Sequence, residues 1–221
     1  MSWTEQTIFF LDFEGSRGSG VVEYGMVGLS GGRVVETKTR LCRPTGLIRP
    51  EDTAVHGLRP EMTAESPLLA EDWDSFAGWR ERGPFAAHYA GVENSLLKAV
   101  WPYPRSSPHF GKPGERVVDW GPWLDSARLY AQFFPHHTSG NLKSLIVASG
   151  LQAELDALAL AHCPAGRRGF HAALYDALAG ALLLLALGRD PRFAPLSLAR
   201  LLALSTLDPG KREDMLQSRL W

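Results

Sequence analysis

The chain is poor in cysteine and in net charge, and each shortage argues against a class of protein. Its two cysteines, Cys42 and Cys163, lie far apart and have neither the spacing of a metal site nor the number needed for a disulfide framework. We therefore expect a reducing, cytoplasmic setting. A formal net charge of −1 provides no basic field of the kind that coats nucleic acid by releasing counterions. That charge still allows an enzyme that holds a phosphate chain locally through metal ions and a few arginines.

Signals for a membrane are also lacking. Residues 1–7 have no basic stretch followed by a long apolar core, so we expect no signal peptide. The most apolar stretch, residues 172–187, is shorter than a bilayer span and is interrupted by Asp176. We expect this stretch to form a buried helix, and we expect no membrane partner.

The order of the predicted elements favours one α/β domain. With 45% hydrophobic and 21% charged residues, the 221-residue chain has the ordinary composition of a folded globular protein. Apolar and alternating patterns predict strands at residues 7–13, 21–29, 33–41 and 85–88, with a hairpin turn at 30–32. Helical spacing predicts helices at residues 68–81, 91–101, 123–133, 142–149, 151–160, 171–187 and 195–204.

We expect a single domain over residues 1–221, because no linker divides the sequence. Its core covers residues 7–188, and residues 189–221 form a C-terminal helical extension. Residues 102–117 are rich in proline, glycine and serine and are predicted to form a loop or insertion. The predicted strands come mostly early in the chain and the predicted helices mostly later, and this order suggests a mixed sheet flanked by helices.

Two acidic residues, Asp12 and Glu14, end the first predicted strand. Residues i and i+2 of a strand point to the same face, so the two carboxylates project together. Carboxylates that close repel each other and lose hydration unless a cation lies between them. Oxygen ligands favour Mg²⁺ or Mn²⁺ over zinc. The plainer interpretation is a solvated strand end.

A second cluster, His171 and Asp176, opens the most apolar predicted helix. An ionised carboxylate in such a helix needs a cation, a salt bridge or an exposed face. If His171 lies at or before the first turn, it can lean over the pocket that Asp176 enters. The alternative interpretation is that Asp176 pairs with an arginine such as Arg167 and that His171 only begins the helix.

Three short motifs occur in a familiar order: Asp12-x-Glu14 after one strand, Ala87-His88-x-Ala90-Gly-x-Glu93 after another, and His171-x₄-Asp176. Together they resemble the three motifs of the DEDDh 3′–5′ exonucleases. That family includes the proofreading subunit of a bacterial replicative polymerase, ribonuclease T and oligoribonuclease. The resemblance implies an α/β, ribonuclease-H-like fold with a mixed β-sheet flanked by α-helices.

The sequence departs from the family pattern at three places. The third carboxylate is normally an aspartate, whereas this chain has Glu93, whose extra methylene lets the same charge reach a metal from slightly further away. The asparagine that usually follows the histidine of the second motif is Tyr89 here. The threonine that usually follows the first glutamate is replaced by Gly15 and Ser16.

The resemblance implies a two-metal site with Mg²⁺ or Mn²⁺. Asp12 is expected to bridge both ions, with Glu14 and Asp176 completing the first site and Glu93 holding the second ion, directly or through water. Neutral His171 is expected to take a proton from the metal-bound water. The expected reaction is hydrolysis of a phosphodiester at the 3′ end of single-stranded DNA or RNA. The residues expected to contact the substrate are Phe13, Ser16, His56, Gly57 and His88.

Plainer roles exist for two of these histidines: a satisfied helix-terminal residue for His56 and a structural hydrogen bonder for His88. Two other functions also fit the motifs. One is a catalytically weak or silent relative that binds nucleic acid or a protein partner, for which Glu93 is the best argument. The other is a metal-dependent phosphoesterase that acts on nucleotides. A homodimer is expected by analogy only.

Overall fold

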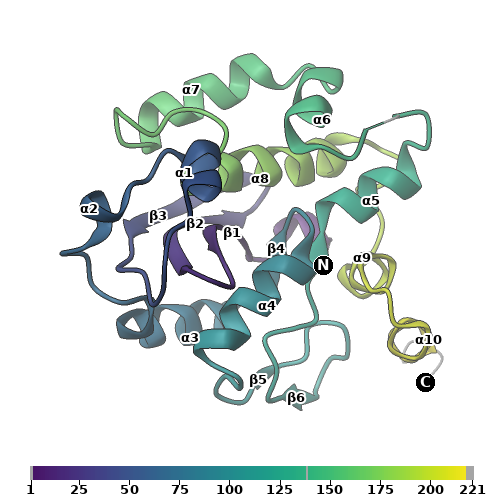
Figure 1. The fold of residues 1–221 in the computed structure, drawn as a ribbon. Helices are drawn as coiled ribbons and strands as arrows, with labels where there is room; N and C mark the ends of the chain where they lie inside the picture. The colour runs from purple at the N-terminus through teal and green to yellow at the C-terminus, as the bar shows by residue number, and fades with distance from the viewer. Residues whose placement is uncertain (1, 138, 218–221) are drawn as a thin grey trace.

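The chain folds around a mixed five-stranded sheet with helices on both faces, as Figure 1 shows. The computed structural model describes residues 2–137 and 139–217. The strand order is β3-β2-β1-β4-β7. The first three strands, β1 (Ile8–Ser16), β2 (Gly20–Ser30) and β3 (Arg33–Leu41), are antiparallel, and β4 (Phe85–Ala87) and β7 (Leu124–Asp125) run parallel to β1. The predicted α/β class and mixed sheet are therefore confirmed.

The apolar run in β1 explains its central place in the sheet. Phe10 points to the face covered by α8 (Ala173–Arg189), whereas Phe9 and Leu11 point to the face covered by α3 (Trp73–Arg82) and α4 (Ala90–Val100). Because successive side chains alternate, a strand buried on both faces must be apolar along its length. The same alternation continues to Asp12 and Glu14, which therefore share the α8 face.

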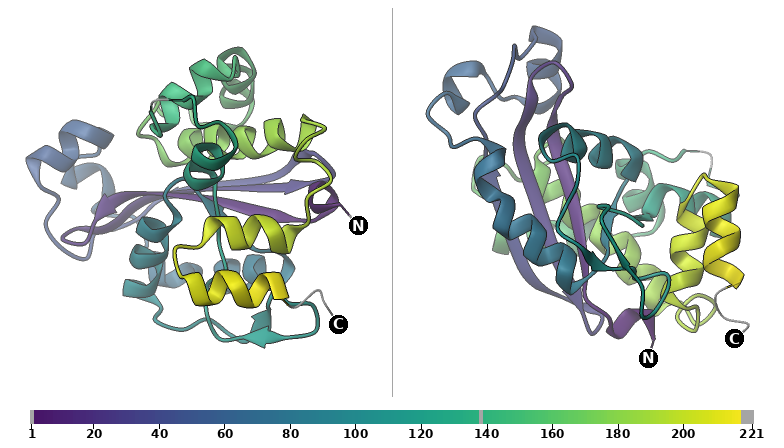
Figure 2. Two further views of the ribbon diagram at one scale, coloured as in Figure 1. Left: turned by 90° about the vertical axis from the view of Figure 1, so that its right-hand side faces the viewer. Right: turned by 90° about the horizontal axis from the view of Figure 1, so that it is seen from below.

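The remaining helices complete two layers around the sheet (Figure 2). On the α8 face lie α6 (Leu142–Ala148) and α7 (Gln152–His162), which pack against α8. α9 (Leu198–Ser205) packs against α5 (Ser126–Phe133) and β7, and α10 (Pro209–Gln217) packs against α9. The expected C-terminal extension thus contains two helices in its described part, and its treatment as part of a single domain stays a prediction. The short elements are α1 (Pro50–His56), α2 (Pro60–Thr63), and two 3₁₀ turns at Trp3–Glu5 and Leu69–Asp72.

Two predictions from the sequence were wrong in detail. The predicted helix at 123–133 begins as the two-residue strand β7, which is too short for any alternation to be visible. The predicted loop at 102–117 contains a small antiparallel pair, β5 (Ser107–Pro108) with β6 (Arg116–Val117). The buried guanidinium of Arg80 fastens this segment, because it donates to the carbonyls of Pro108, Trp120 and Gly121.

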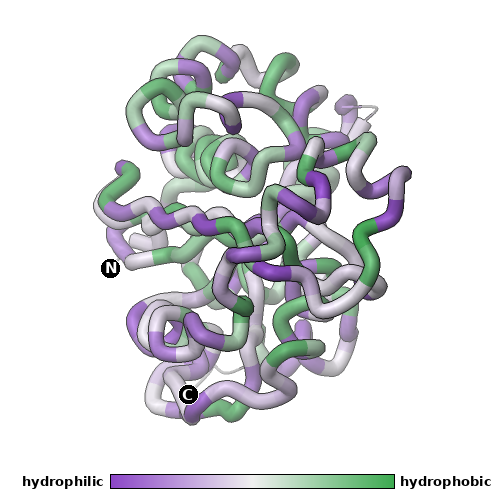
Figure 3. Tube along the Cα trace, turned by 60° about the vertical axis from the view of Figure 1, so that its left-hand side comes forward, coloured by the Kyte–Doolittle hydropathy of each residue, from purple (hydrophilic) through white to green (hydrophobic). Residues whose placement is uncertain are grey.

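The apolar stretch around Asp176 forms the buried helix that was predicted. α8 is buried along most of its length, whereas the outer helices mix hydrophobic and hydrophilic residues along the chain (Figure 3). In the described part of the chain no single helix is long and apolar enough to cross a membrane. The bent pair α6 and α7 reaches that threshold together, by length and composition only, across a 120° break.

A glycine lets the start of α8 lie directly on the sheet. A Cβ at Gly25 in β2 would come within 2.3–2.4 Å of the backbone of Ala173 and Leu174. Gly25 is also the register partner of Asp12 in β1. The backbone of α8 therefore touches β2 beside Asp12, and this close approach brings the first turn of α8 to the acidic end of β1.

Candidate active site

The four predicted carboxylates come together from three elements. Asp12 and Glu14 lie at the C-terminal end of β1, Asp176 lies in the first turn of α8, and Glu93 lies in the first turn of α4. The pairing of β1 with β4 ends at Phe10, so the last residues of β1 have a free backbone edge on that side. The carboxylate of Glu93 uses this edge, because it accepts a hydrogen bond from the backbone amide of Phe13.

The motif at the end of β1 lies close to the motif at the start of α8. One ligand atom from each of Glu14, His171 and Asp176 lies within 4.8 Å of the other two. Glu14 and Asp176 are each only 8% exposed, whereas the side chain of His171 is exposed. A shared cation between these groups is therefore geometrically feasible, as the two motifs suggested.

Burial and mutual repulsion leave these carboxylates poorly stabilised as anions. Burial is the first cause in every case. It raises the pKa of Glu14 and of Glu93 to about 8 and the pKa of Asp176 to about 7. The pKa of Asp12 is also raised well above its usual value, by burial and then by the charges of Asp176, Glu14 and Glu93. Such a cluster is stable at neutral pH only with bound protons or with cations.

The donor atoms of this cluster fit a hard divalent cation. Oε2 of Glu93 and Oδ1 of Asp176 are buried and have no hydrogen-bond partner among the described residues. A buried carboxylate oxygen without a partner is costly, and a cation would remove that cost. The other donors are carboxylate oxygens and one imidazole, which suits Mg²⁺ or Mn²⁺.

The start of α8 has an unusual backbone that orients His171. His171 has a φ of 67°, in the left-handed region, and lies two residues before the helix. Its amide donates to Oδ2 of Asp176 at 3.0 Å. A left-handed histidine costs on the order of 1 kcal/mol, so its contacts must compensate. The helix itself starts at Ala173, so His171 lies before its first turn, and the role of His171 stays a prediction.

Arg167 does not form the ion pair with Asp176 that the alternative interpretation required. Its guanidinium pairs with Glu23 instead, with Nε 3.1 Å from Oε1 and Nη2 close to Oε2. Glu23 lies on β2 as the register partner of Glu14, and its Oε2 also accepts from the amide of Ala173 at 3.0 Å. Sequence reasoning missed this fifth acidic residue, although a lone glutamate in the apolar strand 21–29 was a signal for it.

His56 and Gly57 lie at the C-terminal end of α1, beside Arg167. The His56 ring is buried, and its Nδ1 accepts from the amide of Leu58 at 3.1 Å. Its Nε2 is buried and has no partner among the described residues. Burial, and then the nearby Arg167 charge, lower the pKa of His56, so the neutral ring with its proton on Nε2 is favoured. Gly57 ends the helix at a φ of 74°.

The other expected substrate contacts have partners within the protein. Nδ1 of His88 lies 2.9 Å from Oγ of Ser126 and its Nε2 lies 2.7 Å from the carbonyl of Gly140, as the structural alternative for His88 anticipated. Ser16 donates to Oδ2 of Asp52 at 3.2 Å. The Phe13 ring is 6% exposed and packs against Phe76 on the sheet face opposite Asp12. Contacts of these three residues with a substrate stay predictions.

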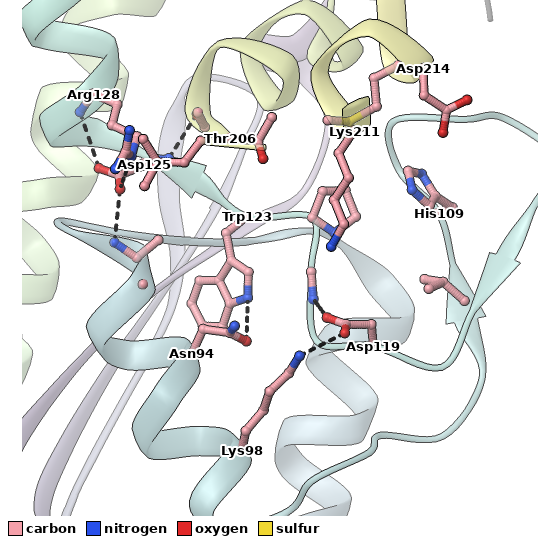
Figure 4. A pocket seen from close by; sticks show the side chains of 18 residues that line it. Asn94, Lys98, His109, Asp119, Trp123, Asp125, Arg128, Thr206, Lys211 and Asp214 are labelled. Carbon is pink, nitrogen blue, oxygen red and sulfur yellow. Dashed lines mark hydrogen bonds and ion pairs between the residues drawn. The ribbon is translucent and has the colours of Figure 1, made fainter. Parts of the chain in front are cut away.

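A cavity of about 490 Å³ lies elsewhere, between α4, the 109–125 segment, α9 and α10 (Figure 4). Two ion pairs lie along its wall, Lys98 with Asp119 at 2.8 Å and Arg128 with Asp125 at 3.3 Å. None of the four carboxylates lines it. Asn94 and Lys98 of α4 face this cavity (Figure 4), whereas Glu93 of the same helix faces the carboxylate cluster.

The raised pKa values predict how stability depends on pH. Glu14, Glu93 and Asp176 bind protons more tightly in the folded protein than at their usual values of 4.5, 4.5 and 3.8. Their contribution is therefore fully present below about pH 4 and is lost as the pH rises through about 7 to 8. In EDTA, the melting temperature is expected to fall as the pH rises from about 5 to about 8.5. Thermal melts across this range check it.

Mg²⁺ provides the matched comparison for this prediction. Because a cation competes with protons for the same oxygens, Mg²⁺ is expected to raise the melting temperature more at high pH than at low pH. A melting temperature that is flat across this pH range, with and without Mg²⁺, would show that the carboxylates do not share one electrostatic site.

No family model and no curated protein matches the sequence. A solved structure of exonuclease X in complex with 5′ overhanging duplex DNA matches with a TM-score of 0.63 and 23% identity, over 88% of this chain and 99% of that chain. Exonuclease I from Methylocaldum szegediense matches with a TM-score of 0.60 and 18% identity, over 85% of this chain and 42% of that chain.

A third match is exonuclease I from E. coli in complex with a dA16 oligonucleotide, with a TM-score of 0.62 and 14% identity, over 85% of this chain and 42% of that chain. The chain thus spans less than half of exonuclease I but nearly all of exonuclease X. At these identities the likeness shows the fold. The chain shares the ribonuclease-H-like fold of these exonucleases.

Proposed function

We propose that this protein is a metal-dependent 3′–5′ exonuclease that hydrolyses phosphodiester bonds at nucleic-acid 3′ ends. The observation that carries the proposal is the buried cluster of Asp12, Glu14, Glu93 and Asp176, in which two carboxylate oxygens lack any partner among the described residues. The likeness in fold to exonuclease X and exonuclease I, solved with duplex DNA and with an oligonucleotide, supports the same class of substrate.

Different carboxylates would bind the two cations. Asp12 would contribute to both sites, because Asp176, Glu14 and Glu93 all act electrostatically on its carboxylate. Glu14 and Asp176 would complete one site and Glu93 the other. When bound, two Mg²⁺ or Mn²⁺ ions neutralise the carboxylates and stabilise charge on the attacking and leaving oxygens of an in-line displacement.

The histidines supply the groups that handle protons and the substrate. The exposed imidazole of His171 would accept the proton of the attacking water, since its ligand atom lies within 4.8 Å of those of Glu14 and Asp176. The Nε2 proton of His56 is a buried donor without a partner among the described residues, and it would donate to an oxygen of the terminal nucleotide. The cytoplasmic location and the homodimer stay predictions.

A labelled oligonucleotide assay tests the proposal. Single-stranded DNA and RNA labelled at the 5′ end are expected to shorten stepwise from the 3′ end with Mg²⁺ or Mn²⁺ and to stay intact in EDTA. A second label at the 3′ end should be released as a mononucleotide in the first step. The Asp12→Ala variant serves as the control and is expected to leave both strands intact.

The same assay separates the two alternatives. Tight binding without shortening indicates the catalytically silent relative, and turnover of mononucleotide esters alone indicates a different phosphoesterase. Glu93 was the best argument for a silent relative. Its carboxylate nonetheless acts on Asp12 and has an unpartnered oxygen within the described residues, which favours the active enzyme.

A further inference from the structure

We propose that Arg167 is a positioning residue, which holds His171 and His56 over the carboxylate cluster and keeps Glu23 out of the set of metal ligands. The inference rests on the proposed function and extends it to a residue outside the three motifs. Its evidence is the number and placement of the contacts that one guanidinium makes.

Arg167 joins three separate parts of the chain. It pairs with Glu23 of β2 through Nε and Nη2. Its Nη1 donates to the carbonyl of His56 at the end of α1 at 2.6 Å, and its Nη2 donates to the carbonyl of His171 at 2.9 Å. The arginine side chain is only 19% exposed. A planar guanidinium can serve acceptors in several directions at once, whereas a lysine ammonium is a single point of charge.

The charge of Arg167 is needed because Glu23 lies so close to the cluster. Glu23 is 4% exposed at its side chain, and its charge raises the pKa of Asp12, Glu14 and Asp176. Arg167 acts in the opposite direction on Glu14 and Asp176. Without Arg167, Glu23 becomes an unpaired buried carboxylate beside Glu14, free to accept a proton or to bind a cation. The ion pair therefore limits the cage to the four motif carboxylates.

The hydrogen bonds of Arg167 are needed because His171 is held by its backbone alone. In the described part of the chain the hydrogen bonds of His171 involve only its amide, which donates to Asp176, and its carbonyl, which accepts from Arg167. With a φ of 67° this residue has an unfavourable conformation that its surroundings must maintain. Arg167 thus fixes the residue that is proposed to accept the proton of the attacking water.

The Arg167→Lys variant separates position from charge. It keeps a positive group for Glu23 but cannot reach both histidine carbonyls. We expect kcat to fall by about 10–100-fold, with KM and Mn²⁺ affinity each changed by less than about 3-fold. We also expect amide hydrogen exchange at His171 to accelerate by about 10-fold, while the melting temperature changes little. The matched control is Arg168→Lys, because Arg168 is the chain neighbour and, among the described residues, donates only to the carbonyls of Cys163 and Leu160.

The Arg167→Met variant and the double variant Glu23→Gln with Arg167→Met isolate the charge. Arg167→Met alone is expected to melt well below the wild type, because it leaves Glu23 buried and unpaired. The double variant is expected to regain most of the lost melting temperature but not the lost kcat, since the carbonyls of both histidines still lack the hydrogen bonds of Arg167. A normal kcat with normal exchange at His171 in Arg167→Lys, or recovery of kcat in the double variant, would overturn the positioning role.

Failure of the proposed function has a different signature. In that case the wild type would not shorten any oligonucleotide. The exchange rate at His171 and the recovery of melting temperature in the double variant would still decide whether Arg167 holds this loop and neutralises Glu23. If the exchange rate at His171 and the melting temperature are those of the wild type in all three variants, Arg167→Met alone included, the inference about Arg167 is wrong, whatever the enzyme activity.

Discussion

Asp176→Asn and Asp12→Asn are expected to abolish nuclease activity and yet to melt above the wild type in metal-free buffer at about pH 8. Each replaces a buried carboxylate by a neutral amide of nearly the same shape. The pKa of Asp176 is raised from 3.8 to about 7. Since one pKa unit corresponds to about 1.4 kcal/mol, removing this unfavourable negative charge stabilises the folded protein by up to about 4 kcal/mol. Removal of a metal ligand should lower kcat by about 10²–10³-fold or more.

Mg²⁺ is expected to reverse this order of stability. It should raise the melting temperature of the wild type by several degrees and that of the two variants by little, because they have lost an oxygen ligand. Calorimetry in EDTA and in Mg²⁺, with oligonucleotide turnover, measures both effects. The control is Asp74→Asn, an exposed carboxylate paired with Arg105, which should change neither quantity. If Asp176→Asn melts below the wild type in EDTA, the cluster is not under electrostatic strain.

The strands and the carboxylates were predictable because each depends on a local pattern. The apolar run ending in Asp12 and Glu14 predicted a central strand with both acids on one face, and the structure has this arrangement. The lone Asp176 in an apolar helix predicted a buried charge that needs a partner. Alternation and helical period are visible in any window of sequence, since they repeat every two or 3.6 residues.

The missed features depend on contacts between distant segments. Glu23 and Arg167 are separated by 144 positions, and although a lone glutamate in an apolar strand is a signal, nothing local indicates that Arg167 is its partner. The strand β7 has two residues, so it offers no period to detect. The left-handed conformation of His171 is unexpected for a residue with a side chain, and it is maintained by Asp176 and Arg167 together. Such contacts exist only once the fold has brought distant segments of the chain together, so no local window of sequence contains them.

Gly25→Ala is expected to destabilise the protein and to remove the response to metal ions. An added Cβ would lie 2.3–2.4 Å from the backbone of Ala173 and Leu174, which cannot move as a side-chain tip can. Relief requires α8 to shift away from β2, and Asp176 in its first turn then moves away from Asp12. Overpacking of this kind costs about 1–3 kcal/mol and sometimes more. We expect a loss of about 3 kcal/mol in the free energy of unfolding, and a loss of kcat of about 100-fold for a displacement near 1 Å.

The matched control for this variant is Gly28→Ala, in the same strand and with the same gain in strand propensity. A Cβ at Gly28 would lie 3.1 Å from Cβ of Glu36 and 3.4 Å from the Phe9 ring, so these neighbours need to move by only a few tenths of an ångström. That variant should unfold at nearly the wild-type denaturant concentration and keep its Mg²⁺-dependent rise in melting temperature. The site requires α8 to rest on β2 beside Asp12, so a Gly25→Ala protein with normal activity and a normal metal response would contradict the packing that assembles the four carboxylates.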